Sequence, residues 1–563
     1  MKRILDNRFW WVILLSAFAV VIYIASYING RVDLTEEKRY SLTESTESLL
    51  ESLDTTVTIE VYLTGDLSAG LRKVRESVDE TLDQYRDIAK GKISVQYINP
   101  FEIDDDSAQA EMIDSLGRYG ITPFTQVAQE SKGTAQTQRL VMPGAVVKSR
   151  NGIYAINFLK GVNNADEQMF YTNIESLLEY KFSNAIEKST RTEVPLIAYA
   201  LGNGQSLGYD AVEAITTLAS EYRLDTVNLD NVSVVPNDYK CLIILQPKEK
   251  FTQEDKLKID QYLMHGGTVF FAADIVDAPL DSLQLKGSAL AYDKGLDITD
   301  LLFRYGIRIN PDLVQDYQST DISMVVGESG GKPQLQNVKW PYYPLVTGKN
   351  HPISKNMDPV FIKYGNSIDT VQASGVKRTI LLSTSVNGKI VASPAIISFN
   401  SLQYAEDASV FNKPHIPVAV LAEGSFRSLF ANRLPQQQLD SLSAIGYKFL
   451  AASNPNAKLI VVSDGDAFLN EVTQKGPMPV GMNRFIGYTF ANKDFFQNSI
   501  DYLTGTSGIF ESRNKTFTVR LLNQEKVEAE RSTWLFVNIG LPVVLILLVG
   551  FLLQWLRKRR YAA

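Results

Sequence analysis

Two uncharged segments of 20 residues, one near each end of the chain, constrain the fold more than any other feature. The first runs from Phe9 to Ile28 and reads FWWVILLSAFAVVIYIASYI. The second runs from Trp534 to Leu553 and reads WLFVNIGLPVVLILLVGFLL. Each is long enough to cross a hydrocarbon core of about 30 Å as a helix. We therefore predict two transmembrane helices.

Basic residues flank both segments on the side that faces a chain end. Lys2, Arg3 and Arg8 precede the first segment, and the run RKRR begins at Arg557, just after the second. The positive-inside rule places such clusters in the cytoplasm. We expect both termini to be cytoplasmic in a bacterial inner membrane, with the bulk of the chain in the periplasm.

Each apolar segment also has an alternative interpretation. The first could be a cleaved signal peptide, since Ala17-Phe18-Ala19 has the small-x-small form of a cleavage site. Cleavage there would leave the apolar stretch VVIYIASYI on the mature chain, which favours a retained helix. The second could be a buried core helix, but its length and lack of charge favour a membrane span.

Composition excludes several classes of protein. A chain of 563 residues is too long for one core and predicts several folded domains. The formal charge of −7 argues against nucleic acid as a partner. Cys241 is the single cysteine, which excludes intramolecular disulfides, CxxC redox chemistry and cysteine-built zinc sites. We expect no cofactor.

The region after the first span predicts a small α/β domain. Apolar periodicity and turn signals give the order β-α-β-α-β-β-α, in which a hairpin turns at Arg150-Asn151-Gly152. This is the order of the thioredoxin fold. After the first predicted strand, where the redox proteins carry CxxC, this chain has Thr64-Gly65-Asp66-Leu67. A thioredoxin-like domain without thiols is a binding or structural module.

A second, larger alternation of strands and helices follows a short linker. Apolar strands such as CLIIL and TVFFA alternate with helical segments, which predicts a mostly parallel, doubly wound sheet. Residues 275–415 break this rhythm and are interpreted as a partly β insertion. Residues 516–522 predict a last strand, after which a charged helix continues into the second span.

These observations divide the chain into six parts. They are 1–30 (N-terminus and first span, about 9–28), 31–190 (thioredoxin-like domain), 191–515 (α/β domain with the insertion), 516–533 (strand and juxtamembrane segment), 534–556 (second span) and 557–563 (cytoplasmic basic tail).

Candidate ligand-binding residues lie where the predicted parallel strands end, since ligands of open α/β sheets bind at the carboxyl ends of the strands. They are Gly202, Asn203, Gly204, Asp274, Asp464 and Asp466. The loop GNGQSLG departs from the dinucleotide fingerprint by one position, so a turn that needs small residues is favoured over a cofactor site. The two carboxylates of Asp464-Gly465-Asp466 could bind a divalent cation, but a strand-end turn with a helix-capping Asp is favoured.

No motif indicates catalysis. Cys241 starts an apolar strand without flanking glycines, which favours a buried thiol over a nucleophile. The three histidines are isolated and show no metal or triad spacing. The segment GESGGK is followed by Pro333 and so is no Walker A motif, which means that this chain is not itself an ABC ATPase.

Several segments together resemble the GldG family, a membrane-anchored auxiliary component of the gliding-motility ABC transporter. They are DLTEEKRYSLTESTESLL, DQYLMHGGTVFFAAD, PVAVLAEGSFRSLF, KLIVVSDGDAFLNE and NKDFFQNSIDYLTGTSGIFESRNKTFTVRLL. The resemblance implies a permease partner similar to GldF and an ATPase partner similar to GldA. The sheet region is also similar to the glutamine-amidotransferase-like domain of some intraflagellar-transport proteins, in which the fold serves assembly.

The leading hypothesis is a non-catalytic auxiliary subunit of an ABC transporter complex that binds and couples to its partners and to the bilayer. The first alternative is a ligand-capturing protein with a site at the strand-end loops. The second is a cryptic hydrolase, for which only Ser463 or Cys241 could supply a nucleophile.

Overall fold

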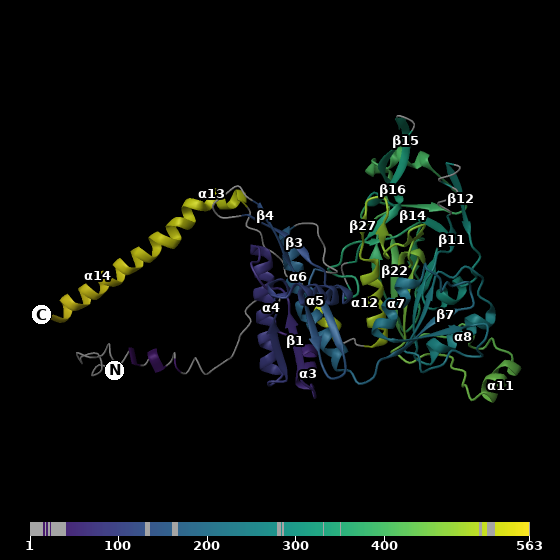
Figure 1. Cartoon of the computed structure of the whole chain (residues 1–563), viewed down its shortest axis with the longest axis horizontal. Helices are drawn as coiled ribbons and strands as arrows, with labels where there is room; N and C mark the ends of the chain where they lie inside the picture. The colour runs from purple at the N-terminus through teal and green to yellow at the C-terminus, as the bar shows by residue number, and fades with distance from the viewer. Residues whose placement is uncertain are drawn as a thin grey trace. The chain divides into compact units, whose positions relative to one another are not determined.

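The computed structural model (Figure 1) describes most of the chain between the two apolar segments, and the second segment itself. The described residues are 41–129, 136–159, 167–278, 287–329, 332–348, 351–505, 509–514 and 524–561, with Leu283 and a few isolated residues of the first apolar segment. The predicted first span and the predicted strand at 516–522 therefore lie outside the continuously described ranges. Contacts divide the chain into two units, Met1–Thr516 and Phe517–Ala563.

The first sheet of the larger unit has four strands in the order β2-β1-β5-β6. Strand β1 is parallel to β2 and antiparallel to β5, and β5 is antiparallel to β6. The elements of this region are α3 (Glu44–Glu51), β1 (Val57–Val61), α4 (Ala69–Ile88), β2 (Ile93–Tyr97), η1 (Pro100–Glu102), α5 (Asp106–Arg118), β3 (Phe124–Gln129), β4 (Gln136–Val141), β5 (Gly144–Lys148), β6 (Ile153–Asn157) and α6 (Glu167–Thr190).

Helix α4 shows why this region folds as its periodicity predicts. Its apolar residues recur every three or four positions, which places them on one face of a helix. All five side chains of this stripe are buried in the core beneath the sheet: Leu71, Val74, Val78, Leu82 and Tyr85. The Tyr85 hydroxyl donates a hydrogen bond to the backbone oxygen of Glu179 on α6, so the two helices are fastened to each other as well as to the sheet.

The hairpin of β3 and β4 is an addition to the predicted order of elements. Its strands carry mainly Gln and Thr and lack the apolar alternation that signals a half-buried strand. Gln126 nevertheless joins the hairpin to the start of α4, because its buried side chain accepts a hydrogen bond of 2.7 Å from the backbone N–H of Ser68, the N-cap of that helix. Among the described residues, the one cis peptide bond is Ser393–Pro394. The peptide bond before Pro143, in the region of the first sheet, is therefore trans.

The second sheet has seven strands in the order β19-β22-β23-β10-β9-β7-β8. The five strands from β23 to β8 are parallel, whereas β22 and β19 are antiparallel to their neighbours. The mixed α/β architecture with a mostly parallel sheet is thus confirmed. The elements of the sheet and its covering helices are β7 (Leu196–Leu201), α7 (Val212–Glu221), β8 (Arg223–Asn228), β9 (Cys241–Leu245), α8 (Gln253–Met264), β10 (Thr268–Ala272), β19 (Val376–Ser383), β22 (Pro417–Gly424), α11 (Gln436–Ala444), β23 (Lys458–Val462), η4 (Asp466–Phe468) and α12 (Asn492–Thr504).

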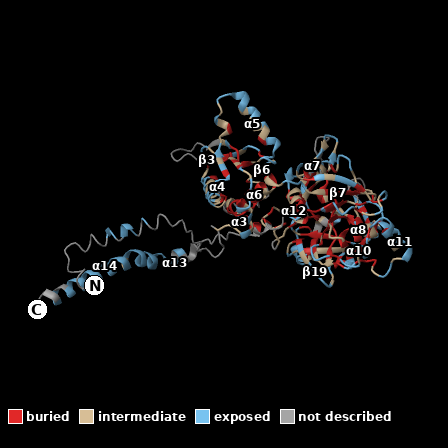
Figure 2. Ribbon diagram, turned by 90° about the horizontal axis from the view of Figure 1, so that it is seen from below, coloured by how far each residue is buried: buried red, intermediate tan, exposed pale blue. Residues whose placement is uncertain are grey.

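Both faces of this sheet are buried, as continuous apolar strands require. On β9, Leu242 and Ile244 pack in the cluster that holds α8, while Cys241 and Ile243 pack in the cluster that holds α7 and α12. Figure 2 shows the resulting buried interior of this region. The sheet is therefore the middle layer of three.

The insertion predicted at 275–415 is β-rich, but its boundaries need a correction. Strand β19 falls inside that range and yet completes the edge of the main sheet beside β22. The other elements are β11 (Val276–Asp277), β12 (Ser288–Asp293), α10 (Thr299–Arg304), β13 (Ile307–Ile309), β14 (Asp312–Asp316), β15 (Ser319–Ser329), β16 (Lys332–Val346), β17 (Val360–Phe361), β18 (Ile368–Thr370), β20 (Gly388–Ala392), β21 (Ala395–Ser398), η2 (Phe399–Tyr404) and η3 (Ala408–Val410). The long hairpin of β15 and β16 extends beyond the body of this region (Figure 1).

The larger unit also contains short elements, and the described residues of the smaller unit form one long helix. The short elements are β24 (Val472–Thr473), β25 (Gly476–Pro477), β26 (Met482–Asn483), β27 (Tyr488–Thr489) and η5 (Ile509–Asn514). The long helix consists of α13 (Gln524–Leu535), the π-helical turn η6 (Phe536–Gly540) and α14 (Leu541–Tyr561). Its stretch Ala529–Leu556 is long and apolar enough to cross a membrane, and its most apolar window has no buried residue. The helix predicted for the second apolar segment is confirmed, and its exposed apolar surface suggests membrane anchoring.

Candidate functional site

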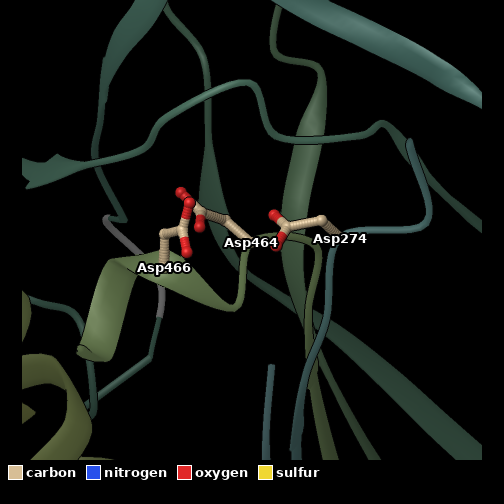
Figure 3. A group of neighbouring side chains, drawn as sticks. All are labelled: Asp274, Asp464 and Asp466. Carbon is tan, nitrogen blue, oxygen red and sulfur yellow. The ribbon is translucent and has the colours of Figure 1, made fainter. Parts of the chain in front are cut away.

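Three of the candidate carboxylates meet at the carboxyl ends of two neighbouring strands. Strands β10 and β23 are parallel, and Ala272 lies opposite Val462. Asp274 and Asp464 each follow two residues later, so the register brings them to the same edge of the sheet. With Asp466, at the start of η4, they place carboxylate oxygens within 4.8 Å of one another. Figure 3 shows the three side chains together, with the carboxyl group of Asp274 directed toward the other two residues.

The Asp464 carboxylate is held by backbone N–H groups. One oxygen accepts a hydrogen bond from the Ala467 N–H at 2.9 Å, which caps the turn η4, and the other accepts from the Lys363 N–H at 2.6 Å. Asp464 is fully buried. Its geometry matches the helix-capping role that the sequence favours, but the contact to Lys363 also binds the insertion to the end of β23.

The Asp274 carboxylate is less well satisfied. Its Oδ1 atom accepts a hydrogen bond of 3.3 Å from the Gly465 N–H. Its Oδ2 atom is buried, has no hydrogen-bond partner, and lies 3.6 Å from the ammonium of Lys294. Asp466 is partly exposed and accepts a hydrogen bond from the side-chain amide of Gln246, which follows β9.

Burial and the repulsion between neighbouring carboxylates raise the pKa values of Asp274 and Asp464. Burial is the main cause that raises the pKa of Asp274 to about 7, and the negative charge of Asp466 adds to it. Burial likewise raises the pKa of Asp464 well above its ordinary range, with contributions from the charges of Asp274 and Asp466. Such perturbed carboxyl groups at a strand end are typical of functional sites, although structural clusters also produce them.

A cavity of about 700 Å³ opens beside the cluster. Asp274, Asp466 and Gln246 contribute to its lining. Most of the other lining side chains are basic or aromatic: Lys248, Lys294, Lys363, Arg484, Tyr292, Tyr343 and Tyr364. Glu471 joins Lys363 and Arg484 through ion pairs of 3.2 and 2.7 Å. The cavity therefore has an acidic region next to a basic, aromatic wall.

The loop Gly202-Asn203-Gly204 does not join the three carboxylates. It follows β7, and β9 lies between β7 and β10 in the sheet, so the strand order separates the loop from Asp274. The Asn203 side-chain amide instead donates a hydrogen bond of 3.3 Å to Asp255 at the start of α8. Gly202 has φ +113°, and a Cβ atom there would lie 2.9 Å from the Asn228 side chain. The loop is a tight turn that needs glycine.

Several lining residues were not expected from the sequence. Gln246 could have been found, because it directly follows the apolar run CLIIL at a strand end. Lys294, Lys363 and Tyr364 come from the insertion, whose weak periodicity gives no indication of where its loops lie.

The two nucleophile candidates are poorly placed for chemistry. Cys241 is fully buried, and burial raises the pKa of its thiol to about 12. The buried Ser463 hydroxyl lies within hydrogen-bond distance of two backbone oxygens, those of Asn366 and Val418. Neither side chain has a hydrogen bond to a general base among the described residues, which a catalytic nucleophile requires.

Comparisons with known proteins place the sheet region in a family. Residues 195–499 match a family described as an ABC-type uncharacterized transport system, and residues 36–148 match a domain of unknown function, DUF7088. An uncharacterized protein of Borreliella burgdorferi is 21% identical over 555 residues, which is 94% of each chain. The alignment therefore covers nearly the full length of both chains.

Likeness to solved structures is weak. The mmIFT52 N-terminal domain aligns with a TM-score of 0.30 and 14% identity, covering 55% of this chain and 97% of that one. The exo-beta-1,4-mannosidase Op5Man5 from an Opitutaceae bacterium aligns with a TM-score of 0.20 and 10% identity, covering 61% of this chain and 39% of that one. Scores this low carry no argument about fold or activity. The family match spans more than half of the 563 residues, and the chain therefore belongs to the family described as an ABC-type uncharacterized transport system, as an auxiliary protein of an ABC transporter.

Proposed function

We propose that this chain is a membrane-anchored, extracytoplasmic auxiliary subunit of an ABC transporter complex of the gliding-motility type. It acts by binding and coupling to a GldF-like permease and a GldA-like ATPase, without catalysis of its own. The observation that carries the proposal is a transport-family α/β domain in the same chain as an exposed apolar helix. A chain that lacks a Walker A motif needs a separate ATPase to supply the energy for transport.

The proposed domains follow from the strand order and the apolar segments. Residues 31–190 form a thioredoxin-like binding module, which the order β2-β1-β5-β6 supports, and residues 191–515 form the α/β domain of the glutamine-amidotransferase-like type. Residues 516–533 lead into the span at 534–556, which the basic tail 557–563 follows on the cytoplasmic side of the inner membrane.

The helix geometry agrees with an anchor. Trp534 lies at the start of the most apolar stretch, and Lys558 and Arg559 lie near its end, as interfacial side chains do on a spanning helix. Each of these three side chains is exposed. The bilayer is therefore the natural environment of this surface.

Purification from native membranes tests the partner set. The full chain is affinity-purified in mild detergent, and the co-eluting subunits are identified by mass spectrometry. A control variant carries an unrelated transmembrane helix in place of 534–556. We expect a permease and an ATPase to elute with the native chain. Elution of the native chain without any ABC subunit would refute the proposal.

Cysteine accessibility tests the topology. Single cysteines are placed at Lys2, Asn151 and Ala562 in a Cys241→Ala background, and spheroplasts are treated with a membrane-impermeant thiol reagent. Asn151 lies exposed in the turn between β5 and β6. We expect the cysteine at 151 to react and those at 2 and 562 to resist until the membrane is permeabilised. Labelling at 2 in intact spheroplasts would contradict cytoplasmic termini.

A further inference from the structure

The carboxylates of Asp274, Asp464 and Asp466 form an acidic group. The basic side chains among the surrounding described residues compensate its negative charge only in part. Two of the three side chains are buried, where like charges within a few ångströms repel strongly. The Lys294 ammonium stands 3.6 Å from Asp274, beyond hydrogen-bond distance. The Lys363 ammonium is directed to Glu471, so Lys363 offers Asp464 its backbone N–H instead.

The Asp274 side chain gives a second, independent indication of a ligand. Only 6% of its surface is exposed, and its Oδ2 atom is buried without a hydrogen-bond partner. Buried polar atoms in native proteins are nearly always hydrogen-bonded, so an exception needs an explanation. Figure 3 shows the Asp274 carboxyl group directed toward the other two. The buried carboxyl group of Asp274 is thus directed toward the point where the three carboxylates converge.

We propose that Asp274, Asp464 and Asp466 bind a hard divalent cation, Mg²⁺ or Ca²⁺, at the carboxyl ends of β10 and β23. All the donors are carboxylate oxygens, which is the ligand type that these ions prefer. Oxygens up to 4.8 Å apart can share one Ca²⁺, since Ca–O distances are about 2.3 to 2.6 Å. For Mg²⁺, with Mg–O distances of about 2.0 to 2.1 Å, the oxygens must lie within about 4.2 Å of one another. The backbone hydrogen bonds of Asp464 use one lone pair of each oxygen and fix its orientation, so a second lone pair of each stays available.

The adjoining cavity gives the ion a route and room for further ligands. Asp274 and Asp466 line it together with Lys294, while Asp464 lies fully buried behind them. Water or an anionic group in the cavity would complete the coordination. Lys294 occupies the position of a competing cation, so its ammonium must move away from Asp274 when the ion binds. This assignment is independent of the partner set proposed above, and either can fail alone.

The test uses the full chain in detergent after treatment with EDTA. Isothermal titration calorimetry with MgCl₂ and with CaCl₂ measures stoichiometry and affinity, and thermal unfolding measures the shift in Tm. We expect one ion per chain for at least one of the two salts, and a rise in Tm with that salt. The comparison of the two salts identifies the ion.

Four variants separate the site from general surface charge. Asp466→Asn removes a partly exposed ligand and should fold normally while losing the Tm rise. Asp274→Asn should lose binding and melt at a higher temperature than the native chain in EDTA, because it removes a buried like charge. Asp277→Asn, on the same cavity wall but outside the cluster, is the matched control and should bind as the native chain does. Lys294→Gln should bind more tightly.

Three results would overturn the assignment. The first is no saturable binding of either ion to the native chain. The second is unchanged binding in both Asp466→Asn and Asp274→Asn. The third is weaker binding in Lys294→Gln, because Lys294 would then not compete with the ion at Asp274.

Discussion

Lys188 of α6 is a buried cation, and its removal should test how firmly α6 is fastened to the helices around it. The Nζ atom lies 3.0 Å from Asp501 on α12 and 2.5 Å from Glu221 on α7, and 5% of the side chain is exposed. The Tyr222 hydroxyl donates a further hydrogen bond to Asp501. Burial by itself would lower the pKa of Lys188, but the two carboxylates outweigh it, so the pKa lies well above the ordinary value.

The substitution Lys188→Met removes the ammonium and keeps most of the stem. It removes the ammonium that lies 3.0 Å from Asp501, whose surface is 3% exposed. Loss of one partner of a buried ion pair costs about 3–5 kcal/mol, because the remaining charge is uncompensated. The double variant Lys188→Met/Asp501→Asn removes that charge and should regain a large part of the loss, with the Tyr222 hydroxyl still able to donate to the amide oxygen.

Thermal and urea unfolding of the full chain in detergent measures these differences. Because the pKa of Lys188 is raised, its contribution is fully present below the ordinary lysine pKa of 10.5 and is lost only as the pH rises through the folded value. The Lys188 ammonium therefore stays charged in the native chain from pH 6 to pH 9. In Lys188→Met, the pKa of Asp501, which burial already raises, rises further, because the cation that lowers it is gone. The deficit should therefore shrink as the pH falls and Asp501 takes up a proton. A loss smaller than about 1 kcal/mol, or a double variant no more stable than the single one, would refute the ion-pair argument.

Substitutions at two further residues, Cys241 and His351, have defined outcomes. Cys241→Ala should lower the free energy of unfolding by about 1 kcal/mol, and Cys241→Ser should lower it more, since it buries a hydroxyl. Both variants should still complement transport in cells. The native thiol, which is buried, should resist labelling until the chain unfolds. For His351, burial and the charges of Lys377 and Lys458 lower the pKa to about 4, so its contribution to stability is present above pH 6.5 and is lost as the pH falls toward 4. Over that interval, the free energy of unfolding of the native chain should therefore fall by about 2 kcal/mol more than that of His351→Gln. Urea unfolding at each pH measures both values, and equal decreases in the two chains would contradict the argument.

Periodicity was sufficient to predict the regular elements that have a clear apolar pattern. The stripe of α4 and the apolar strands β9, β10 and β23 are visible in the sequence because burial on one face, or on both, leaves a period that can be counted. The convergence of Asp274 and Asp464 was also expected, since parallel strands end at a common edge.

Strand order and the insertion were not predictable in the same way. Asn203 was grouped with Asp274 because both follow parallel strands, but nothing in the sequence indicates that β9 lies between β7 and β10. Strand β19 was assigned to the insertion because the alternation in VKRTILLS is short and its partner β22 is distant in the chain. Lys294 and Lys363 reach the carboxylates through irregular loops, whose paths depend on tertiary contacts.

The position of β23 has a consequence for the order in which the chain can fold. It is the last of the seven strands to be synthesised, yet it lies between β10 and β22. Until residues 458–462 are available, β10 has an unpaired edge, and β22 has no neighbour on that side. An unpaired apolar edge promotes association with other chains, and pairing between distant segments is slow. A chain truncated before Lys458 should therefore be prone to aggregation and depend on chaperones, even though it retains six of the seven strands.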